Sequence, residues 1–161
     1  MSEIIIREIE PRDNKAVANL IREVLVELGA PKVGTAYEDK SLDVLSEVYD
    51  KDKAAYFVTE VDGIIVGGAG VSQLENTTDN ICELQKMYFS SQARGKGLGA
   101  IMIRKCVETA KGLGYEKCYL ETLPYMKSAV KLYKKTGFKT LSQPLGNTGH
   151  YSCTEWMIKE L

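Results

Sequence analysis

Three glycines at alternate positions, Gly95, Gly97 and Gly99, follow a short polar run and precede a long helical pattern. Glycines at a strand-to-helix turn let the backbone approach a ligand closely, because no Cβ atoms stand in the way. The first turn of a helix also presents unpaired N–H groups and the positive end of its dipole, which favour phosphate. The stretch therefore predicts a phosphate-bearing ligand held mainly by backbone, with Arg94 and Lys96 adding positive charge.

The spacing of these residues excludes two common nucleotide-binding loops. A Walker-type loop has Ser or Thr after its lysine, whereas Gly97 follows Lys96. The dinucleotide fingerprint has two residues between its second and third glycines, whereas Leu98 alone separates Gly97 from Gly99. The residue chemistry leaves open a flexible loop before a helix that binds nothing.

The segment from Arg94 to Gly99 reads Arg-x-x-Gly-x-Gly, and in this form it resembles the acyl-CoA pyrophosphate loop of the GNAT superfamily of N-acetyltransferases. The resemblance covers most of the chain and is strongest over residues 82–138. It implies that acetyl-CoA is held by the loop and by the backbone of the preceding strand, where the Met87 N–H would polarise the acetyl carbonyl. The implied cofactor-binding residues are Met87, Tyr88, Phe89, Arg94, Gly95, Lys96, Gly97, Leu98, Gly99 and Ala100.

Direct attack of an amine on a thioester requires a base for the amine and an acid for the leaving thiolate. By resemblance, Glu83 is the candidate base, provided that partial burial raises its pKa. The alternative is an ordinary strand glutamate paired with a lysine. Tyr133 is the candidate acid, because the segment Met126–Phe138 resembles the family's second CoA-side motif. The alternative for Tyr133 is a core tyrosine on an amphipathic helix.

The sequence departs from that second motif at Met126, where the family often has an asparagine that binds the CoA arm. A polar contact to the cofactor is therefore expected to be missing, and Ser128 or Lys135 would supply a contact in its place.

The acceptor side is expected to come from the 29–40 loop, with Tyr37, Glu38 and Asp39, from Glu121, and from His150. Acidic residues in this region would suit a cationic amine. The alternatives are solvated surface residues and, for the single histidine, a hydrogen-bonded structural role.

Bulk properties place the chain among globular proteins. Its 161 residues fit one domain, 1–161, and its net charge of −1 argues against a nucleic-acid or anionic-membrane partner. The isoleucine run near the N-terminus reads as a strand, and no apolar run approaches the roughly 20 residues that span a bilayer. Four cysteines without a Cys-x-x-Cys pair, beside one histidine, predict reduced thiols, no metal site and a cytoplasmic protein, with Cys82, Cys106 and Cys118 expected to be buried.

Hydrophobic periodicity predicts alternating strands and helices. Strands are expected at 3–8, 54–61, 64–72, 81–89, 116–121, 138–141 and 150–160, and helices at 13–28, 41–49, from the glycines to about 111, and at 126–136. Asp62-Gly63 predicts a type I′ hairpin. The strand–helix–strand order predicts that 81–89 and 116–121 are parallel. The result is one α/β domain, a mixed and mostly antiparallel sheet of about seven strands flanked by about four helices, with the parallel pair at the acyl-CoA site.

The favoured function is transfer of the acetyl group of acetyl-CoA to a primary amine of a small molecule or peptide, in a ternary complex. One alternative is a non-catalytic acyl-CoA-binding sensor or interaction module. Another is acetylation of a protein or of a tRNA, although a tRNA substrate would require a basic surface that a net charge of −1 does not offer. An edge strand of the C-terminal hairpin offers a surface for a homodimer.

Overall fold

The computed structural model describes residues 2–123 and 126–161. Within these residues the chain forms one seven-stranded sheet in the order β1-β2-β3-β4-β5-β7-β6. The strands are β1 (Ile4–Glu8), β2 (Ala55–Val61), β3 (Ile64–Gln73), β4 (Ile81–Phe89), β5 (Lys117–Thr122), β6 (Lys139–Leu141) and β7 (Glu155–Glu160). The α-helices are α1 (Asn14–Glu27), α2 (Leu45–Val48), α3 (Leu98–Gly112) and α4 (Lys127–Lys135), and the 3₁₀ helices are η1 (Pro11–Asp13), η2 (Ala36–Glu38), η3 (Lys40–Val44) and η4 (Ser91–Ala93).

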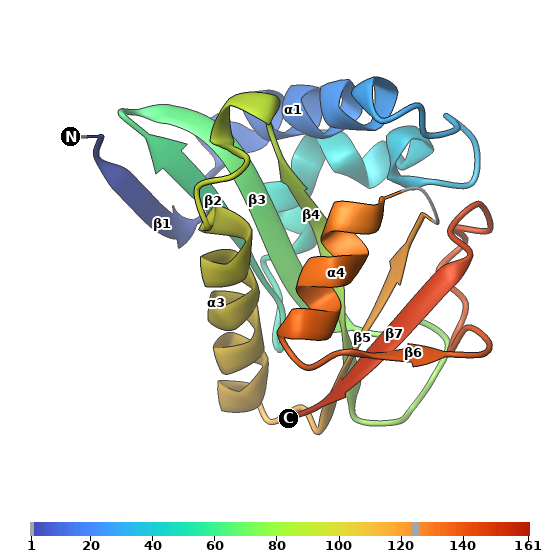
Figure 1. Ribbon diagram of the computed structural model, residues 1–161. Helices are drawn as coiled ribbons and strands as arrows, with labels where there is room; N and C mark the ends of the chain where they lie inside the picture. The colour runs from blue at the N-terminus through green and yellow to red at the C-terminus, as the bar shows by residue number, and fades with distance from the viewer. Residues whose placement is uncertain (1, 124–125) are drawn as a thin grey trace.

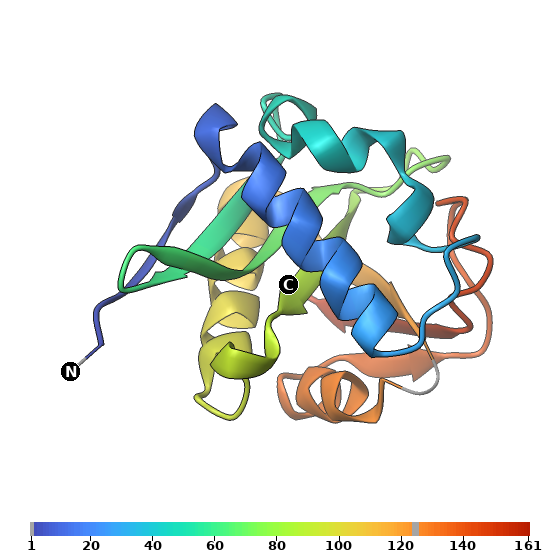
Figure 2. The same ribbon diagram turned by 90° about the horizontal axis from the view of Figure 1, so that it is seen from above.

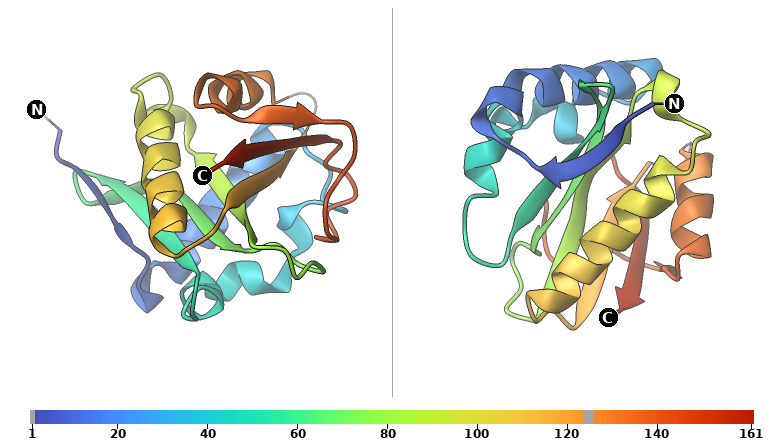
Figure 3. Two further views of the ribbon diagram at one scale, coloured as in Figure 1. Left: turned by 90° about the horizontal axis from the view of Figure 1, so that it is seen from below. Right: turned by 90° about the vertical axis from the view of Figure 1, so that its left-hand side faces the viewer.

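The helices cover the two faces of the sheet (Figures 1 and 3). On one face α3 and α4 pack against the sheet through a cluster that includes Met102, Cys106, Tyr133 and Phe138. On the other face α1 runs across the strands, as the view from above shows (Figure 2), and packs with the segment 36–49 against β2. No helix in the described part of the chain is long and apolar enough to cross a membrane.

Most of the predicted elements lie close to their predicted positions, although the helix expected at 41–49 is a 3₁₀ helix, η3, followed by the four-residue α2. The parallel pairing joins Ile81–Glu83 of β4 to Lys117–Tyr119 of β5. The remaining neighbours in the sheet are antiparallel. Asp62 and Gly63 both have positive φ, at 52° and 82°, which is the backbone of a type I′ turn. The mixed, mostly antiparallel sheet with four flanking α-helices is therefore confirmed.

The prediction that the final strand begins at residue 150 is wrong. In the structure β7 begins at Glu155, and His150–Cys153 form a turn in which the Cys153 N–H donates to the His150 carbonyl at 3.0 Å. The Ser152 N–H donates to the Gly34 carbonyl instead of to a strand partner. The two loops thus pair with each other, and the 29–40 loop, which was expected to be irregular, contains η2.

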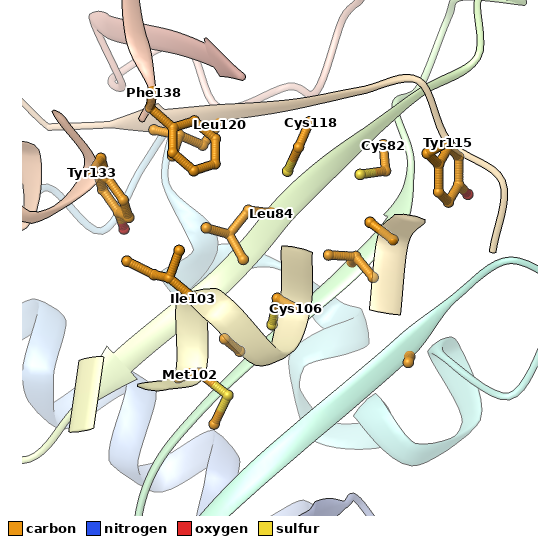
Figure 4. Packing of buried hydrophobic residues seen from close by; sticks show 14 of the residues in the cluster. Cys82, Leu84, Met102, Ile103, Cys106, Tyr115, Cys118, Leu120, Tyr133 and Phe138 are labelled. Carbon is orange, nitrogen blue, oxygen red and sulfur yellow. The ribbon is translucent and has the colours of Figure 1, made fainter. Parts of the chain in front are cut away.

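The core between the sheet and α3 contains the three thiols that were expected to be buried. Cys82, Cys106 and Cys118 are each fully buried. Cys82 of β4 lies directly opposite Cys118 of β5 in the parallel pair, and Figure 4 shows both near Cys106 of α3. In Figure 4 the labelled cluster extends from Tyr133 at one end to Tyr115 at the other.

Candidate active site at the split of the sheet

The parallel pairing between β4 and β5 ends long before β4 does. Pairing stops at Glu83 and Tyr119, while β4 continues to Phe89 and β5 to Thr122. A cleft lies at this split and encloses about 430 Å³ of space outside the protein atoms, part of it open to solvent. It is lined by Thr35, Leu84, Lys86, Met87, Tyr88, Leu120, Glu121, Thr122, Leu123, Met126, Tyr133 and Cys153.

A β-bulge in β4 decides which side chains reach each face of the sheet. Gly68 of β3 pairs with Tyr88 and Gly70 with Gln85, so one extra residue lies on β4 between these pairs. Lys86 adopts a left-handed backbone with φ 50° at this point. Because a bulge shifts the alternation by one residue, side chains before and after it change faces.

The packing shows the consequence of that shift. Leu84 before the bulge and Met87 after it both contact the α3-side cluster, although they are three residues apart. Gln85 accepts a hydrogen bond from the Tyr49 hydroxyl, and Tyr88 packs in the α1-side cluster. Glu83 therefore lies on the α1 side of the sheet, while Met87 faces α3.

Glu83 is deeply buried, with 5% of its surface exposed. The Gln85 side-chain N–H donates to its Oε1 at 2.7 Å. Burial raises the pKa of Glu83 to about 7, and the nearby charge of Glu121 adds to the rise, while the hydrogen bond from Gln85 opposes it. Glu83 does not itself line the cleft. Its raised pKa is suited to accepting a proton near neutral pH, through water or a neighbouring group.

Tyr133 lines the cleft from α4 and is 6% exposed. Its ring meets Phe138 edge-on, with 6.0 Å between the ring centroids. Burial raises the pKa of Tyr133 well above its usual range. The hydroxyl is therefore protonated at neutral pH and is able to donate a proton or a hydrogen bond into the cleft.

The glycine loop has the backbone that phosphate binding requires. Gly95 and Gly97 both have φ 76°, and Gly97 is the N-cap of α3, which has no side-chain cap. The first helical hydrogen bond runs from the Ile101 N–H to the Gly97 carbonyl, so the preceding N–H groups of the helix have no partner within it. A Cβ on Gly99 would lie 2.9 Å from the Leu132 side chain, so glycine lets α3 approach α4 here.

The two basic residues of this loop are placed differently. Lys96 is exposed. Arg94 forms an ion pair with Glu27 of α1, and its Nε donates to the Phe89 carbonyl at 3.1 Å. The guanidinium therefore ties the loop to α1, and its expected role in phosphate binding stays a prediction.

At the start of α4, Met126 stands where the resembled motif often has an asparagine. Met126 lines the cleft, and its sulfur lies 3.7 Å from the Thr122 hydroxyl. Thus a thioether occupies the position at which the resembled motif often has an amide. Ser128 is exposed on the first turn of α4 and does not line the cleft.

The predicted acceptor-side residues are only partly brought together. Glu121 lines the cleft and accepts from the Tyr119 hydroxyl at 2.7 Å and from the Thr148 hydroxyl. His150 Nε2 lies 2.9 Å from Asp39 Oδ2, close to the cleft-lining Lys86.

Two further residues of the 29–40 loop have other surroundings. Tyr37 does not line the cleft, and its ring centroid lies 5.1 Å from Lys32 Nζ and 6.0 Å from the Arg22 guanidinium. Glu38 accepts from the Gly34 N–H at 2.6 Å, which shapes the loop.

The cleft-lining residues that were not identified from the sequence include three with polar side chains on the acceptor side, namely Thr35, Lys86 and Cys153. For Lys86 a signal is present, because the adjacent polar pair Gln85-Lys86 interrupts the alternation and the apolar phase resumes at Met87. Such a phase change within a strand indicates a bulge. Thr35 and Cys153 lie on separate loops, and nothing in their local sequence brings them together.

Comparisons with known proteins agree with this geometry. A family model described as the acetyltransferase (GNAT) family matches residues 20–138. The chain is 40% identical over 158 residues to the uncharacterized N-acetyltransferase YjgM of Escherichia coli K12, covering 98% of this chain and 95% of that protein.

Two solved structures share the fold. A GNAT-family acetyltransferase from Staphylococcus aureus Mu50 matches with a TM-score of 0.85 and 20% identity, over 99% of each chain. The PaiA N-acetyltransferase of Thermoplasma acidophilum, solved in complex with coenzyme A, matches with a TM-score of 0.77 and 18% identity, again over 99% of each chain.

Proposed function

Because this chain belongs to the GNAT family of acetyltransferases, we propose that it transfers the acetyl group of acetyl-CoA to a primary amine of a small molecule or peptide. The observation that carries the proposal is the cleft at the split between β4 and β5, which is lined by residues from both faces of the sheet. One substrate would approach from the α3 and α4 side and the other from the α1 side.

The residues around the glycine loop fit the donor substrate. The uncapped first turn of α3 and the positive φ values of Gly95 and Gly97 offer backbone N–H groups to a pyrophosphate. The part of β4 beyond its pairing with β5 lies beside the cleft and has backbone groups available for an extended pantetheine arm. Met87 lines the cleft on this stretch, as its proposed contact with the acetyl carbonyl requires.

In the proposed reaction the amine nitrogen attacks the thioester carbonyl carbon. A C–N bond forms and the C–S bond breaks. The amine proton passes to Glu83, directly or through water, and the leaving thiolate takes a proton from Tyr133. The products are the N-acetylated amine and CoA with a free thiol. Glu83, with its pKa of about 7, and the protonated Tyr133 are suited to these two roles.

The test compares Tyr133→Phe with Tyr115→Phe in an assay of thiol release from acetyl-CoA with a panel of amines. We expect Tyr133→Phe to lower kcat by roughly 10²-fold or more, because it removes the proton donor, and to leave the acetyl-CoA Kd within about twofold. Tyr115 is the matched control, because it lies at the far end of the same core and its hydroxyl donates to the Lys53 carbonyl at 2.6 Å. Tyr115→Phe is expected to alter stability and leave kcat unchanged.

Two outcomes would contradict the proposal. Equal losses of kcat and of acetyl-CoA affinity in Tyr133→Phe would remove the acid role. Binding of acetyl-CoA by calorimetry, without thiol release for any amine in the panel, would favour the non-catalytic acyl-CoA-binding module instead.

A further inference from the structure

A largely buried lysine and a histidine both contact one carboxylate oxygen on the α1 side of the cleft. Lys86 Nζ lies 3.4 Å from Asp39 Oδ2, and His150 Nε2 lies 2.9 Å from the same oxygen. The Lys86 side chain is 10% exposed, yet the residue lines the cleft. An ammonium group is rarely buried to this degree without several partners.

The bulge explains why a lysine reaches this place. Without it, Lys86 would share the face of Cys82 and Leu84 and point into the apolar cluster beneath α3. The left-handed backbone at Lys86 turns its side chain to the α1 side, where the loop that holds Asp39 lies. A strained backbone at the cleft wall thus places a cation there, and strain of this kind is concentrated at functional sites.

The Lys86 ammonium has fewer direct partners in this group than its three N–H donors could serve. Burial tends to lower the pKa of His150, but the hydrogen bond and charge of Asp39 outweigh it, and the net result is a raised pKa. Burial likewise opposes ionisation of Asp39, but His150 and Lys86 lower its pKa overall. One Asp39 oxygen therefore contacts both His150 and Lys86, and Lys86 has three N–H donors but one ionic contact at 3.4 Å among the described residues.

The remaining charged groups near the cleft are acidic. Glu121 lines the cleft with both carboxylate oxygens in hydrogen bonds from hydroxyl groups. Glu83 lies close enough to Lys86, His150 and Glu121 for each of them to affect its pKa. The α1 side of the cleft thus offers both a cationic group and carboxylates, a combination that matches a zwitterion.

We infer that the acceptor carries a carboxylate beside its amine, as an α-amino acid does, and that Lys86 and His150 bind that carboxylate. This inference rests on the proposed function and specifies its substrate class. The carboxylate of the acceptor would accept hydrogen bonds from the Lys86 ammonium, and its amine would lie toward Glu83 and Glu121. Hydrogen bonds between ionised groups in a partly desolvated cleft are strong enough to select such acceptors.

The test uses acceptor sets in which each amino acid is compared with its methyl ester and with its decarboxylated amine. For the wild-type protein we expect at least one amino acid to have a kcat/KM about 10-fold or more above those of its ester and amine. Lys86→Met should remove this preference by raising the KM of the acid, while the acetyl-CoA KM changes by less than about twofold. His150→Gln should act in the same direction, and because it lies in a loop it keeps the test available if Lys86→Met does not fold.

Lys53→Met is the matched control for the lost charge and for the backbone. Lys53 also has positive φ, at 60°, but it is exposed and its ammonium lies over the Tyr115 ring, away from the cleft. This variant should keep the wild-type preference for the acid. If esters and amines are acetylated as well as the acids, or if Lys86→Met lowers all three alike, the inference is overturned while the proposed function stands.

A binding measurement separates failure of the inference from failure of the proposed function. If no acceptor releases thiol, the proposed function fails, and calorimetry with N-acetyl amino acids and the matching N-acetyl amines in the presence of CoA still tests the carboxylate site. Binding of the acid alone, lost in Lys86→Met and His150→Gln, supports the inference. Equal binding of both compounds, or of neither, overturns it.

Discussion

At Glu83, burial has opposite consequences for reactivity and for stability. The residue is 5% exposed, and within the described part of the chain its carboxylate accepts one side-chain hydrogen bond, from Gln85. Burial disfavours the charged form, and this raises the pKa of Glu83 to about 7. A base with this pKa can accept a proton efficiently near neutral pH. The same burial destabilises the folded protein whenever Glu83 is ionised, because water would solvate the charge better. Both consequences are measurable.

The first consequence is a pH-dependent rate. Since the base must be ionised, kcat/KM should rise with pH up to about 7 and level off above it. Glu83→Gln should lower kcat/KM by roughly 10²-fold and abolish this acidic limb. The exposed Glu108 on α3 provides the control, because Glu108→Gln should leave the profile unchanged. A Glu83→Gln enzyme with the wild-type profile would show that another group or a water chain accepts the proton.

The second consequence is a pH-dependent stability. The folded-state pKa of Glu83, about 7, lies above its ordinary value of 4.5, so the folded state holds this proton more tightly than the unfolded chain does. The cost to folding is absent below about pH 4.5 and grows until about pH 7. Glu83→Gln should therefore be more stable than wild type at pH 8, by at most about 3 kcal/mol, with little difference at pH 4.5. Urea unfolding at the two pH values measures this, and an equal difference at both would contradict it.

At the scale of elements, the sequence predicted most of the fold, because apolar periodicity and turn residues act locally. The helix of the glycine loop, the Asp62-Gly63 hairpin and the parallel pairing of β4 with β5 all follow from short stretches. The bulge at Lys86 was not predicted, because the apolar residues of 81–89 are compatible with a single unbroken strand. The start of β7 was misplaced because His150–Cys153 pair with a distant loop, and no local pattern encodes that contact.

Because these sequence patterns are local, they predict the glycine loop better than the acceptor side of the site. The glycine loop is one continuous segment, so its residues could be identified together. The acceptor side combines Lys86, Asp39 and His150, which come from a strand and two loops far apart in the chain. Asp39 and His150 were both expected on the acceptor side. Their contact could not be predicted, because it depends on how two distant loops fold beside the cleft.

The glycine loop supports a prediction that separates strain from ligand binding. Gly97 and Gly29 have nearly the same φ, 76° and 73°, and a Cβ at either position would meet nothing within 4 Å. Alanine at either position should therefore cost a similar backbone strain of about 1 kcal/mol, measured by urea unfolding. Gly97→Ala alone should also raise the acetyl-CoA KM, by about 10-fold, because Gly97 caps the first turn of α3. A comparable rise in Gly29→Ala would argue that general destabilisation is the cause.

For the molecule as a whole, the split of the sheet divides the fold into two parts. β1 to β4 form one antiparallel part with α1, and β5, β7 and β6 form a second part with α4 beside them (Figure 1). The two parts are joined within the sheet by three residue pairs, Ile81–Glu83 with Lys117–Tyr119. This short junction leaves the rest of β4 and β5 free to form the walls of the cleft, and the buried packing beneath α3 completes the connection between the parts.

The buried cysteines at the short junction provide a way to measure how often the core opens. Cys82 and Cys118 lie opposite each other within the three joined pairs, and Cys106 packs in the same cluster, so a thiol reagent can reach them only when this packing opens. Cys153, at the cleft, is partly exposed and should react first, despite a pKa that burial raises to about 12. In a Cys153→Ser background, the rate of labelling with Ellman's reagent under native conditions should measure how often this packing opens. Acetyl-CoA bound in the cleft as proposed should slow this labelling, and an unchanged labelling rate at saturating acetyl-CoA would show that the ligand does not hold the two parts together.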